Sequence, residues 1–462
     1  MSDQKARFNP ARGSFPGFAV RMLSICLLMS GFTACIRHSP SNPSNFNVIC
    51  ISIDSLRVDF VGFNGMPDPV SPFLDSLSRD SINFTDVMTQ APSTFFSHRA
   101  IFLSRYIFAQ HRNIPVPTET LAGQLQRGGW RTGAFVDGGW LSNHLGHQIG
   151  FDIYDDSGGG FTKNIVKSLQ FIQEDRDRKF FVFLHGYDIH APYNPPEEFL
   201  THLTKSRTPR IPVGASCEQE KAARLKHENR ALFKAEIRQC DAVLSQLFFS
   251  LQQLDLMDET VVAVFSDHGE SLGERGYVGH SQLYQKQLKI PLLVYIPGHR
   301  TQLRPEPVEV IDLMPSILEL VNLQPPDSVQ GIDLHLADSS AGTFPENRAR
   351  LTETTDEAFS ADGEWSLILR DKPENDELYF LSVDPEETVN LRDSSVDRLN
   401  MMRRAYEEKT GEDLAVSRTA KKEIYQSDMV ARKRLMPARG SQKESASQEK
   451  FESELRALGY LN

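Results

Sequence analysis

Short apolar runs recur along the chain and alternate with stretches of helical periodicity. Five runs are continuously apolar and rich in β-branched residues, at positions 48–53, 132–136, 180–184, 261–265 and 291–296. Continuous rather than alternating apolar character is typical of parallel strands that are covered on both faces. Helical patterns lie between them, at 164–174 and over the long stretch 218–254. This alternation predicts an α/β fold with a doubly wound, mostly parallel sheet.

The pattern changes beyond residue 331. Positions 365–370 and 377–381 indicate two strands of a small antiparallel unit, whereas residues 398–450 are charged and poor in large apolar side chains. We therefore expect three successive parts. They are a main α/β domain at 47–345, a small C-terminal α+β subdomain at 346–397, and a charged, helical or loosely ordered tail at 398–462.

The first 35 residues have the pattern of an export segment. Basic residues precede a short apolar run that starts at Met22 and is too short for a comfortable membrane span. Its end, Phe32-Thr33-Ala34-Cys35, resembles a bacterial lipoprotein cleavage box, with simple cleavage or an uncleaved anchor as alternatives. We expect an exported protein of the cell envelope or periplasm, with membrane association through lipidated Cys35 or the N-terminal anchor. Residues 36–46 then form a flexible tether.

Charge narrows the class of partner. The 462 residues carry a formal net charge of -11. Binding to a phosphate backbone relies on a surplus of Lys and Arg, so we expect no nucleic-acid partner. Cys217 and Cys240 could pair in an oxidising compartment. The oligomeric state is left open.

Polar residues suited to chemistry follow three of the predicted strands. Asp54 follows the first, residues 185–190 contain two histidines, and Asp267-His268-Gly269-Glu270 follows the run at 261–265. In doubly wound sheets such groups collect beyond the carboxyl ends of the strands. A carboxylate beside an imidazole suits a divalent cation. Taken alone, the Asp-His-Gly turn is also a common structural turn, and Asp54 is also a good helix N-cap.

Seven segments together resemble motifs of the sulfatase family, in the family's order and spacing. They are residues 51–59, 71–75, 90–98, 185–193, 267–274, 279–280 and 289–293. Further matches follow at 377–379, 384–391 and 455–460. The resemblance covers about residues 46–395 and the end of the chain. It implies an alkaline-phosphatase-like α/β fold.

The resemblance also implies roles for particular residues. The implied ligands of one divalent cation are Asp54, Thr94, Asp267 and His268. Thr94 would supply the nucleophilic oxygen, because a hydroxyl bound to a divalent cation loses its proton more easily. His190 and His280 are expected near the substrate oxyanion and the leaving group, with His185 a lesser candidate. The expected cation is calcium, magnesium or manganese, and the sequence does not separate these from zinc.

The chain departs from the family at the nucleophile. A typical sulfatase carries Cys-x-Pro-Ser-Arg, whereas the aligned residues here are Thr94-Phe95-Phe96-Ser97-His98. Thr cannot become formylglycine, because its β-carbon already carries a methyl group. A formylglycine hydrate has a second hydroxyl that expels sulfate, and a Thr ester has none, so Thr94 favours phosphoryl chemistry. Ser55 stands where many sulfatases have a second Asp, which implies one carboxylate ligand fewer.

Three functions are compatible with these residues. The first is a metal-dependent hydrolase of sulfate or phosphate esters, acting on a small-molecule, glycan or lipid ester. The second is a transferase that moves a phosphoryl headgroup within the cell envelope. The third is a binding protein that kept the fold and lost the chemistry. The retained Asp54, Asp267, His268 and His190 favour the hydrolase, because a site without catalysis has no physical need of its metal ligands.

Overall fold

The computed structural model describes residues 46–67, 70–107, 120–200, 216–337, 348–354, 357–360, 363–370 and 372–411. The predicted export segment, its Cys35, nearly all of the tether and most of the tail lie outside these residues. Among the described helices, none combines the length and the apolar character that a membrane crossing requires. Localisation and anchoring therefore stay predictions.

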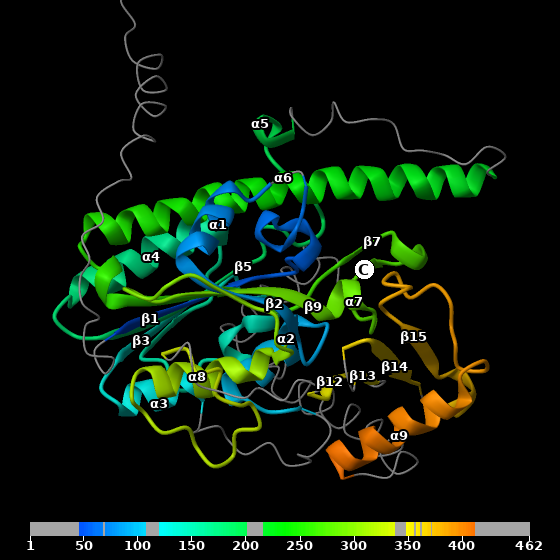
Figure 1. Cartoon of the computed structure of the whole chain (residues 1–462). Coiled ribbons are helices and arrows are strands. Elements are labelled where there is room, and N and C mark those ends of the chain that lie inside the picture. Colours follow the sequence, from blue (N-terminus) through cyan, green and yellow to red (C-terminus); the bar gives the residue numbers. More distant parts are fainter. Residues whose placement is uncertain are drawn as a thin grey trace, which may run out of the picture. The chain divides into compact units, whose positions relative to one another are not determined.

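A mixed, mostly parallel sheet forms the centre of the described chain (Figure 1). Its strand order is β10-β2-β9-β6-β1-β5-β3-β4, and β11 pairs with β2. The strands on the path are β10 (Gln302–Arg304), β2 (Ser81–Met88), β9 (Lys289–Tyr295), β6 (Thr260–Phe265), β1 (Asn47–Ile53), β5 (Phe180–Gly186), β3 (Arg131–Phe135) and β4 (Ile153–Asp155), and β11 spans Val308–Glu309. The doubly wound α/β prediction is confirmed.

All five apolar runs are strands, but one runs in the opposite direction to the prediction. β9 pairs antiparallel with β6 and with β2. Its central residues are buried like those of its parallel neighbours. A continuously apolar run indicates that both faces of the strand are covered, but it does not indicate the direction of the strand.

Helices cover both faces of the sheet (Figure 1). One layer contains α1 (Pro72–Leu77), α4 (Gly160–Glu174) and α6 (Cys217–Gln253), and the other contains α2 (Thr94–Leu103), α3 (Leu121–Arg127) and α8 (Leu313–Leu320). Alternate residues of β1 point to opposite layers. Val48 and Cys50 pack in the core beneath α8, whereas Ile49 and Ile51 pack in the core beneath α6. The covering helices thus explain why β1 carries no polar alternation.

A second, antiparallel sheet follows. It contains β12 (Arg350–Glu353), β13 (Glu357–Ser360), β14 (Trp365–Leu369) and β15 (Glu377–Phe380) in sequence order. The two predicted strands correspond to β14 and β15, while β12 and β13 were not predicted. The predicted domain boundaries stay predictions. The first residues of the predicted tail, from position 398, lie in α9 (Val396–Thr410).

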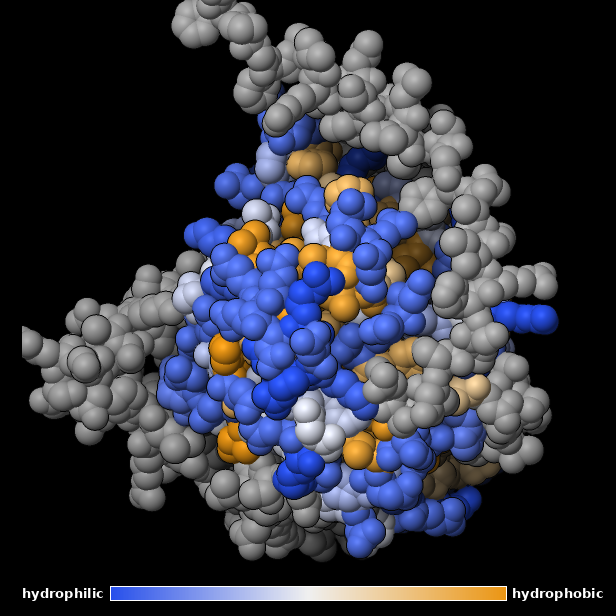
Figure 2. Space-filling view, turned by 90° about the vertical axis from the view of Figure 1, so that its left-hand side faces the viewer, coloured by the Kyte–Doolittle hydropathy of each residue, from blue (hydrophilic) through white to orange (hydrophobic). Residues whose placement is uncertain are grey.

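The antiparallel sheet shares its core with the helix that carries Thr94. Leu351, Leu367 and Leu378 belong to the same buried cluster as Phe95 and Ala100 of α2. Other short elements include α5 (Glu197–Leu200), α7 (Gln285–Leu288), β7 (Ser271–Leu272) and β8 (Val278–Gly279). On the face that Figure 2 shows, apolar side chains lie in small groups between hydrophilic ones.

Candidate active site

Two neighbouring parallel strands deliver the predicted acidic residues to one place. β1 pairs with β6 as far as Ser52, which lies opposite Phe265. Asp54 follows the end of β1, and Asp267 follows the end of β6. Both carboxylates are fully buried. The backbone N–H of Ser55 donates to Asp267 Oδ1 at 3.1 Å. The carboxyl ends of the strands therefore bring together side chains that are more than 200 positions apart.

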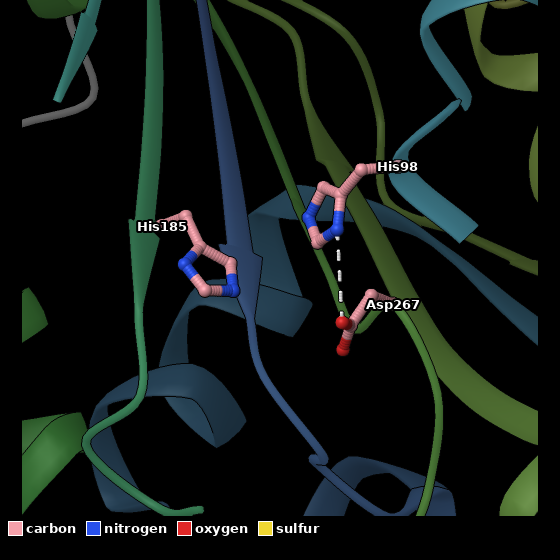
Figure 3. Close-up of side chains that lie close together, drawn as sticks. All are labelled: His98, His185 and Asp267. Atoms are coloured by element: carbon pink, nitrogen blue, oxygen red, sulfur yellow. Dashed lines mark ion pairs between the residues drawn. The ribbon is translucent and has the colours of Figure 1, made fainter. Parts of the chain in front are cut away.

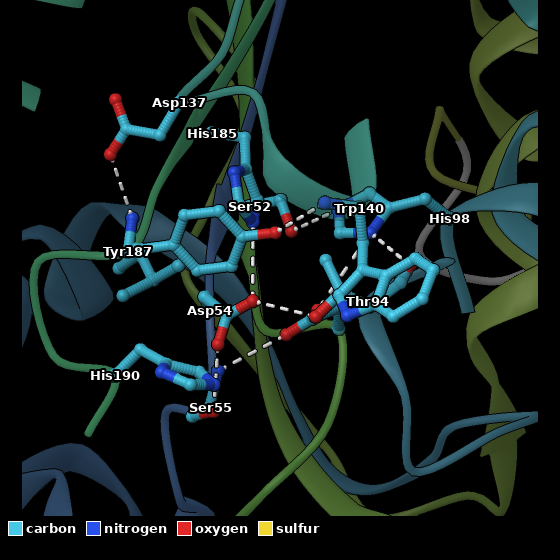
Figure 4. A network of polar contacts seen from close by, with 12 residues as sticks. Ser52, Asp54, Ser55, Thr94, His98, Asp137, Trp140, His185, Tyr187 and His190 are labelled. Carbon is cyan, nitrogen blue, oxygen red and sulfur yellow. Dashed lines mark hydrogen bonds and ion pairs between the residues drawn. The ribbon is translucent and has the colours of Figure 1, made fainter. Parts of the chain in front are cut away.

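Thr94 is the first residue of α2, and its hydroxyl faces the acidic pair (Figure 4). Thr94 Oγ1 donates to Asp54 Oδ2 at 3.1 Å and lies 3.4 Å from His268 Nε2. The same helix is held against the Asp267 loop, because Ser97 Oγ donates to the Asp267 carbonyl at 2.8 Å. A helix N-terminus presents positive dipole character, which favours an anion at this position.

His268 has the tautomer that a metal ligand needs. Its Nδ1 donates to the Gly269 carbonyl at 2.9 Å, so the lone pair of Nε2 faces Asp267 Oδ2 at 3.5 Å. Burial, with a contribution from His280, lowers the pKa of His268 to about 3 and keeps the ring neutral. Gly269 is required here, since a Cβ would lie 2.2 Å from the Lys286 carbonyl.

The carboxylates of Asp54 and Asp267 have the pKa shifts and contacts expected of a cation site. Burial and the charge of Asp54 raise the pKa of Asp267 well above its ordinary value. Burial acts on Asp54 in the same direction, but the hydrogen bond from His185 and nearby histidine charges lower the pKa of Asp54 well below its ordinary value. Asp267 Oδ2 is buried and accepts no hydrogen bond from the described residues. Ligand atoms of Asp54, Asp267 and His268 lie within 4.8 Å of one another, so the residues fit a divalent cation.

The two histidines predicted at the substrate lie beside this group. The His280 ring centroid is 4.3 Å from that of His268 and 5.3 Å from that of His190. Burial lowers the pKa of both His190 and His280. The structure thus brings all six predicted site residues together, while their catalytic roles stay predictions.

Two further histidines complete the site. His185, a lesser candidate from sequence, lies in β5 with Nε2 3.3 Å from Asp54 Oδ2. From the sequence, His98 is interpreted only as the residue that stands where the family has Arg. It is fully buried, its Nδ1 donates to the Thr94 carbonyl at 2.7 Å, and its Nε2 lies 2.9 Å from Ser52 Oγ. Helical spacing was the available signal, because His98 lies four residues after Thr94 and so on the same helix face.

Two residues support the site from behind: Arg57, which sequence reasoning already places in a supporting position, and Tyr187, to which it gives no role. Tyr187 lies beside His185 and His190, with ring centroids 4.8 Å and 5.5 Å away, and its hydroxyl accepts from the Trp140 N–H at 3.2 Å. Arg57 is buried, pairs with Asp59 through two hydrogen bonds, and donates to the Glu270 carbonyl at 3.0 Å. Arg57 therefore fixes the loop that follows His268.

Comparison with known proteins agrees with this geometry. The sequence profile described as Sulfatase matches residues 46–323. The arylsulfatase of Clostridium perfringens is 21% identical over an alignment that covers 78% of this chain and 93% of that protein. The ulvan-active sulfatase of Formosa agariphila is 25% identical, with 63% of this chain and 65% of that protein covered.

Solved structures give the same fold. The phosphonate monoester hydrolase of Agrobacterium radiobacter superposes with a TM-score of 0.66 at 16% identity, covering 81% of this chain and 96% of that one. A likeness at this identity concerns the fold alone. The family profile, in contrast, spans more than half of the sequence. On these grounds, the chain belongs to the sulfatase family.

Proposed function

We propose that this protein is a metal-dependent hydrolase of sulfate or phosphate esters in which Thr94 is the nucleophile. One observation carries the proposal: Thr94 Oγ1 lies 3.1 Å from Asp54 Oδ2 and 3.4 Å from His268 Nε2, at the N-terminus of α2. A hydroxyl placed beside candidate metal ligands and at a helix dipole can both lose its proton and meet an anionic ester.

The chain's own residues supply the steps of the reaction. Thr94 Oγ1 already donates its hydrogen to the Asp54 carboxylate. Its oxygen forms a bond to the sulfur or phosphorus atom while its proton passes to Asp54, and the ester oxygen leaves as an oxyanion that a neutral histidine stabilises with an N–H hydrogen bond. His190 and His280 lie on the same side of the site and are the candidates. Water then hydrolyses the Thr94 ester and regenerates the hydroxyl.

A bound divalent cation would add two effects to this arrangement. Held by Asp54, Asp267 and His268, it supplies acidification of the nearby hydroxyl and neutralisation of a substrate oxygen. The transferase and binding-protein alternatives gain no support from the relatives, which are named as sulfatases.

Substrate class and location complete the proposal. The curated relatives favour a sulfate ester, whereas a Thr ester has no second hydroxyl to expel sulfate and so favours a phosphorus ester. One relative is named for ulvan, which supports a glycan ester among the possible substrates. The N-terminal sequence supports export to the cell envelope, and the substrate would then be met outside the cytoplasm.

Hydrolysis of matched chromogenic esters tests the proposal. Aryl sulfate, phosphate monoester, phosphate diester and phosphonate ester are each offered with Mg²⁺, Ca²⁺, Mn²⁺ or Zn²⁺. We expect turnover of at least one ester, a loss on the order of 10³-fold or more in Thr94→Ala, and retention within about tenfold in Thr94→Ser, which keeps the hydroxyl. Thr301→Ala, at an exposed position, is the matched control.

Either of two results would count against it. Turnover that survives Thr94→Ala would mean that another atom is the nucleophile. Absence of turnover of every ester, in wild-type protein that binds metal, would transfer support to the transferase or the binding protein.

A further inference from the structure

A second group of potential ligands lies against the first. His98, His185 and Asp267 are all fully buried, and their ligand atoms lie within 4.8 Å of one another. They come from three separate elements, namely α2, β5 and the end of β6 (Figure 3). Figure 3 shows the two imidazole rings facing the space between them, with Asp267 beside His98. The His98 Nδ1 to Asp267 Oδ2 distance is 3.7 Å.

The hydrogen bond of His98 leaves one of its ring nitrogens with a lone pair. Because His98 Nδ1 donates to the Thr94 carbonyl, His98 Nε2 carries the lone pair. This is the arrangement that metal-ligating histidines commonly have, with the second ring nitrogen fixed by a backbone carbonyl. Only the Ser52 hydroxyl, at 2.9 Å, is described at that lone pair. A hydroxyl hydrogen bond of this kind can be exchanged for a metal bond.

Asp267 adds a buried atom without a hydrogen-bond partner in the described part of the chain. Asp267 Oδ1 accepts from the backbone N–H groups of Ser55 and His268, whereas Oδ2 accepts no hydrogen bond from the described residues. His185 turns its Nε2, which lies 3.3 Å from Asp54 Oδ2, toward this space, while its Nδ1 is on the opposite edge of the ring (Figure 3). A buried carboxylate oxygen without a hydrogen-bond partner is costly, which makes a missing ligand the simplest explanation for the position of Asp267 Oδ2.

Charge makes a second cation useful. The ionised forms of Asp54 and Asp267 carry two negative charges, and one divalent cation offsets no more than these. Within the described residues, the hydrogen bonds and ion pairs of Asp54, Thr94 and Asp267 come from Ser, Thr, His and backbone groups, and none comes from Lys or Arg. Among these contacts an anionic ester would therefore meet no Lys or Arg charge at the nucleophile, and only the dipole of α2 would favour it there.

We propose that His98, His185 and Asp267 bind a second divalent cation next to the one held by Asp54, Asp267 and His268, with Asp267 shared between them. The inference deepens the proposed function, since it concerns the same site. Two imidazoles with one carboxylate favour Zn²⁺ or Mn²⁺ over Ca²⁺. Cations in such paired sites lie about 3.5–4 Å apart and together stabilise the attacking and leaving oxygens.

Metal content and electron paramagnetic resonance test this without any substrate. The wild-type protein is saturated with Mn²⁺, dialysed against metal-free buffer, and assayed by elemental mass spectrometry. We expect two Mn²⁺ per chain and the spectrum of a spin-coupled pair. His98→Gln and His185→Gln should each retain one Mn²⁺ with an uncoupled spectrum. His299→Gln, a histidine in another part of the fold, should retain the coupled pair.

Two outcomes would overturn the inference. One is a single, uncoupled Mn²⁺ per chain in wild-type protein, a result that decides the matter even if the variants do not fold. The other is a coupled pair in folded His98→Gln and His185→Gln. Neither depends on turnover, so two bound Mn²⁺ in an enzyme inactive on all esters would sustain this inference while contradicting the proposed function.

Discussion

Ser55 connects the two buried carboxylates of the candidate metal site. Its hydroxyl donates to Asp54 Oδ1 at 2.7 Å, and its backbone N–H donates to Asp267 Oδ1 at 3.1 Å. The backbone at Ser55 has a positive φ of 60°, a conformation that Asp tolerates better than most residues. Where the family often supplies a further carboxylate, this chain supplies a hydroxyl and keeps the Asp pair in position.

Adding the carboxylate back should change metal affinity. We expect Ser55→Asp to tighten Mn²⁺ binding by about tenfold, or about 1.4 kcal/mol, because a third negative charge lies beside the cation. Isothermal titration calorimetry measures the change. Ser55→Ala removes the hydroxyl without adding charge and should alter affinity by less. Equal affinities in the Asp and Ala variants would show that position 55 does not face the cation.

Individual site residues were predictable to different degrees. Asp54, Asp267 and His268 follow strands, and the family motifs led to Thr94, His190 and His280. The interpretation of His98 was incomplete, because its contact with Ser52 joins residues 46 positions apart. Such a contact depends on how α2 packs on β1, and local sequence patterns do not encode that packing.

At the level of elements, a buried carboxyl joins the segment after β15 to α7. Glu387 is 1% exposed, and its Oε2 accepts from the backbone N–H of Gln285 at 2.7 Å. Burial raises the pKa of Glu387 from 4.5 to about 7. The folded protein therefore holds this proton more tightly than the unfolded chain, and ionisation of Glu387 at higher pH destabilises the fold.

Glu387→Gln should remove that pH dependence. Below the unfolded pKa of 4.5 both states are protonated, so the variant should match the wild type. As pH rises through about 7 the wild type loses stability, and at about pH 8.5 the variant should be more stable by up to about 3 kcal/mol. Urea unfolding at both pH values measures this. Glu386→Gln, at a partly exposed neighbour, should show no such trend, and a destabilised Glu387→Gln at high pH would refute the sign.

The strands divide into those that hydrophobic pattern could identify and those it could not. β1, β5 and β6 are covered on both faces and read as continuous apolar runs. β2 was missed, because Thr85 and Asp86 interrupt it at the place where its register against β9 shifts. Asp86 instead forms ion pairs with Lys289 and Arg350. A strand that carries a bulge and a charge network lacks the pattern by which strands are recognised.

For the molecule as a whole, the centre of the sheet ends in a buried ionisable cluster. Asp54 and Asp267 are both fully buried, and each lies within reach of a histidine. Bringing two carboxylates out of water side by side costs free energy unless a cation or a proton offsets the charge. The fold therefore carries an electrostatic penalty that a bound cation would relieve.

Metal removal should consequently lower thermal stability. A ligand that binds only the folded state at about 100 times its Kd stabilises it by about 2.7 kcal/mol. We expect EDTA to lower the thermal midpoint of the wild type and Mn²⁺ to restore it, as measured by calorimetry. Asp267→Asn removes one of the two charges and the shared ligand, so its midpoint should respond little to EDTA. An equal response in both proteins would place the stabilising metal elsewhere.

The most direct test of the central claim is to look for the covalent intermediate on Thr94. The metal-loaded protein is mixed with an excess of its best chromogenic ester, quenched in acid within the first turnovers, digested, and mapped by mass spectrometry. We expect a peptide containing Thr94 whose mass has increased by one phosphoryl or sulfuryl group, and no such adduct in Thr94→Ala. An active enzyme that carries the group on another residue, or that shows full burst kinetics without Thr94, would contradict it.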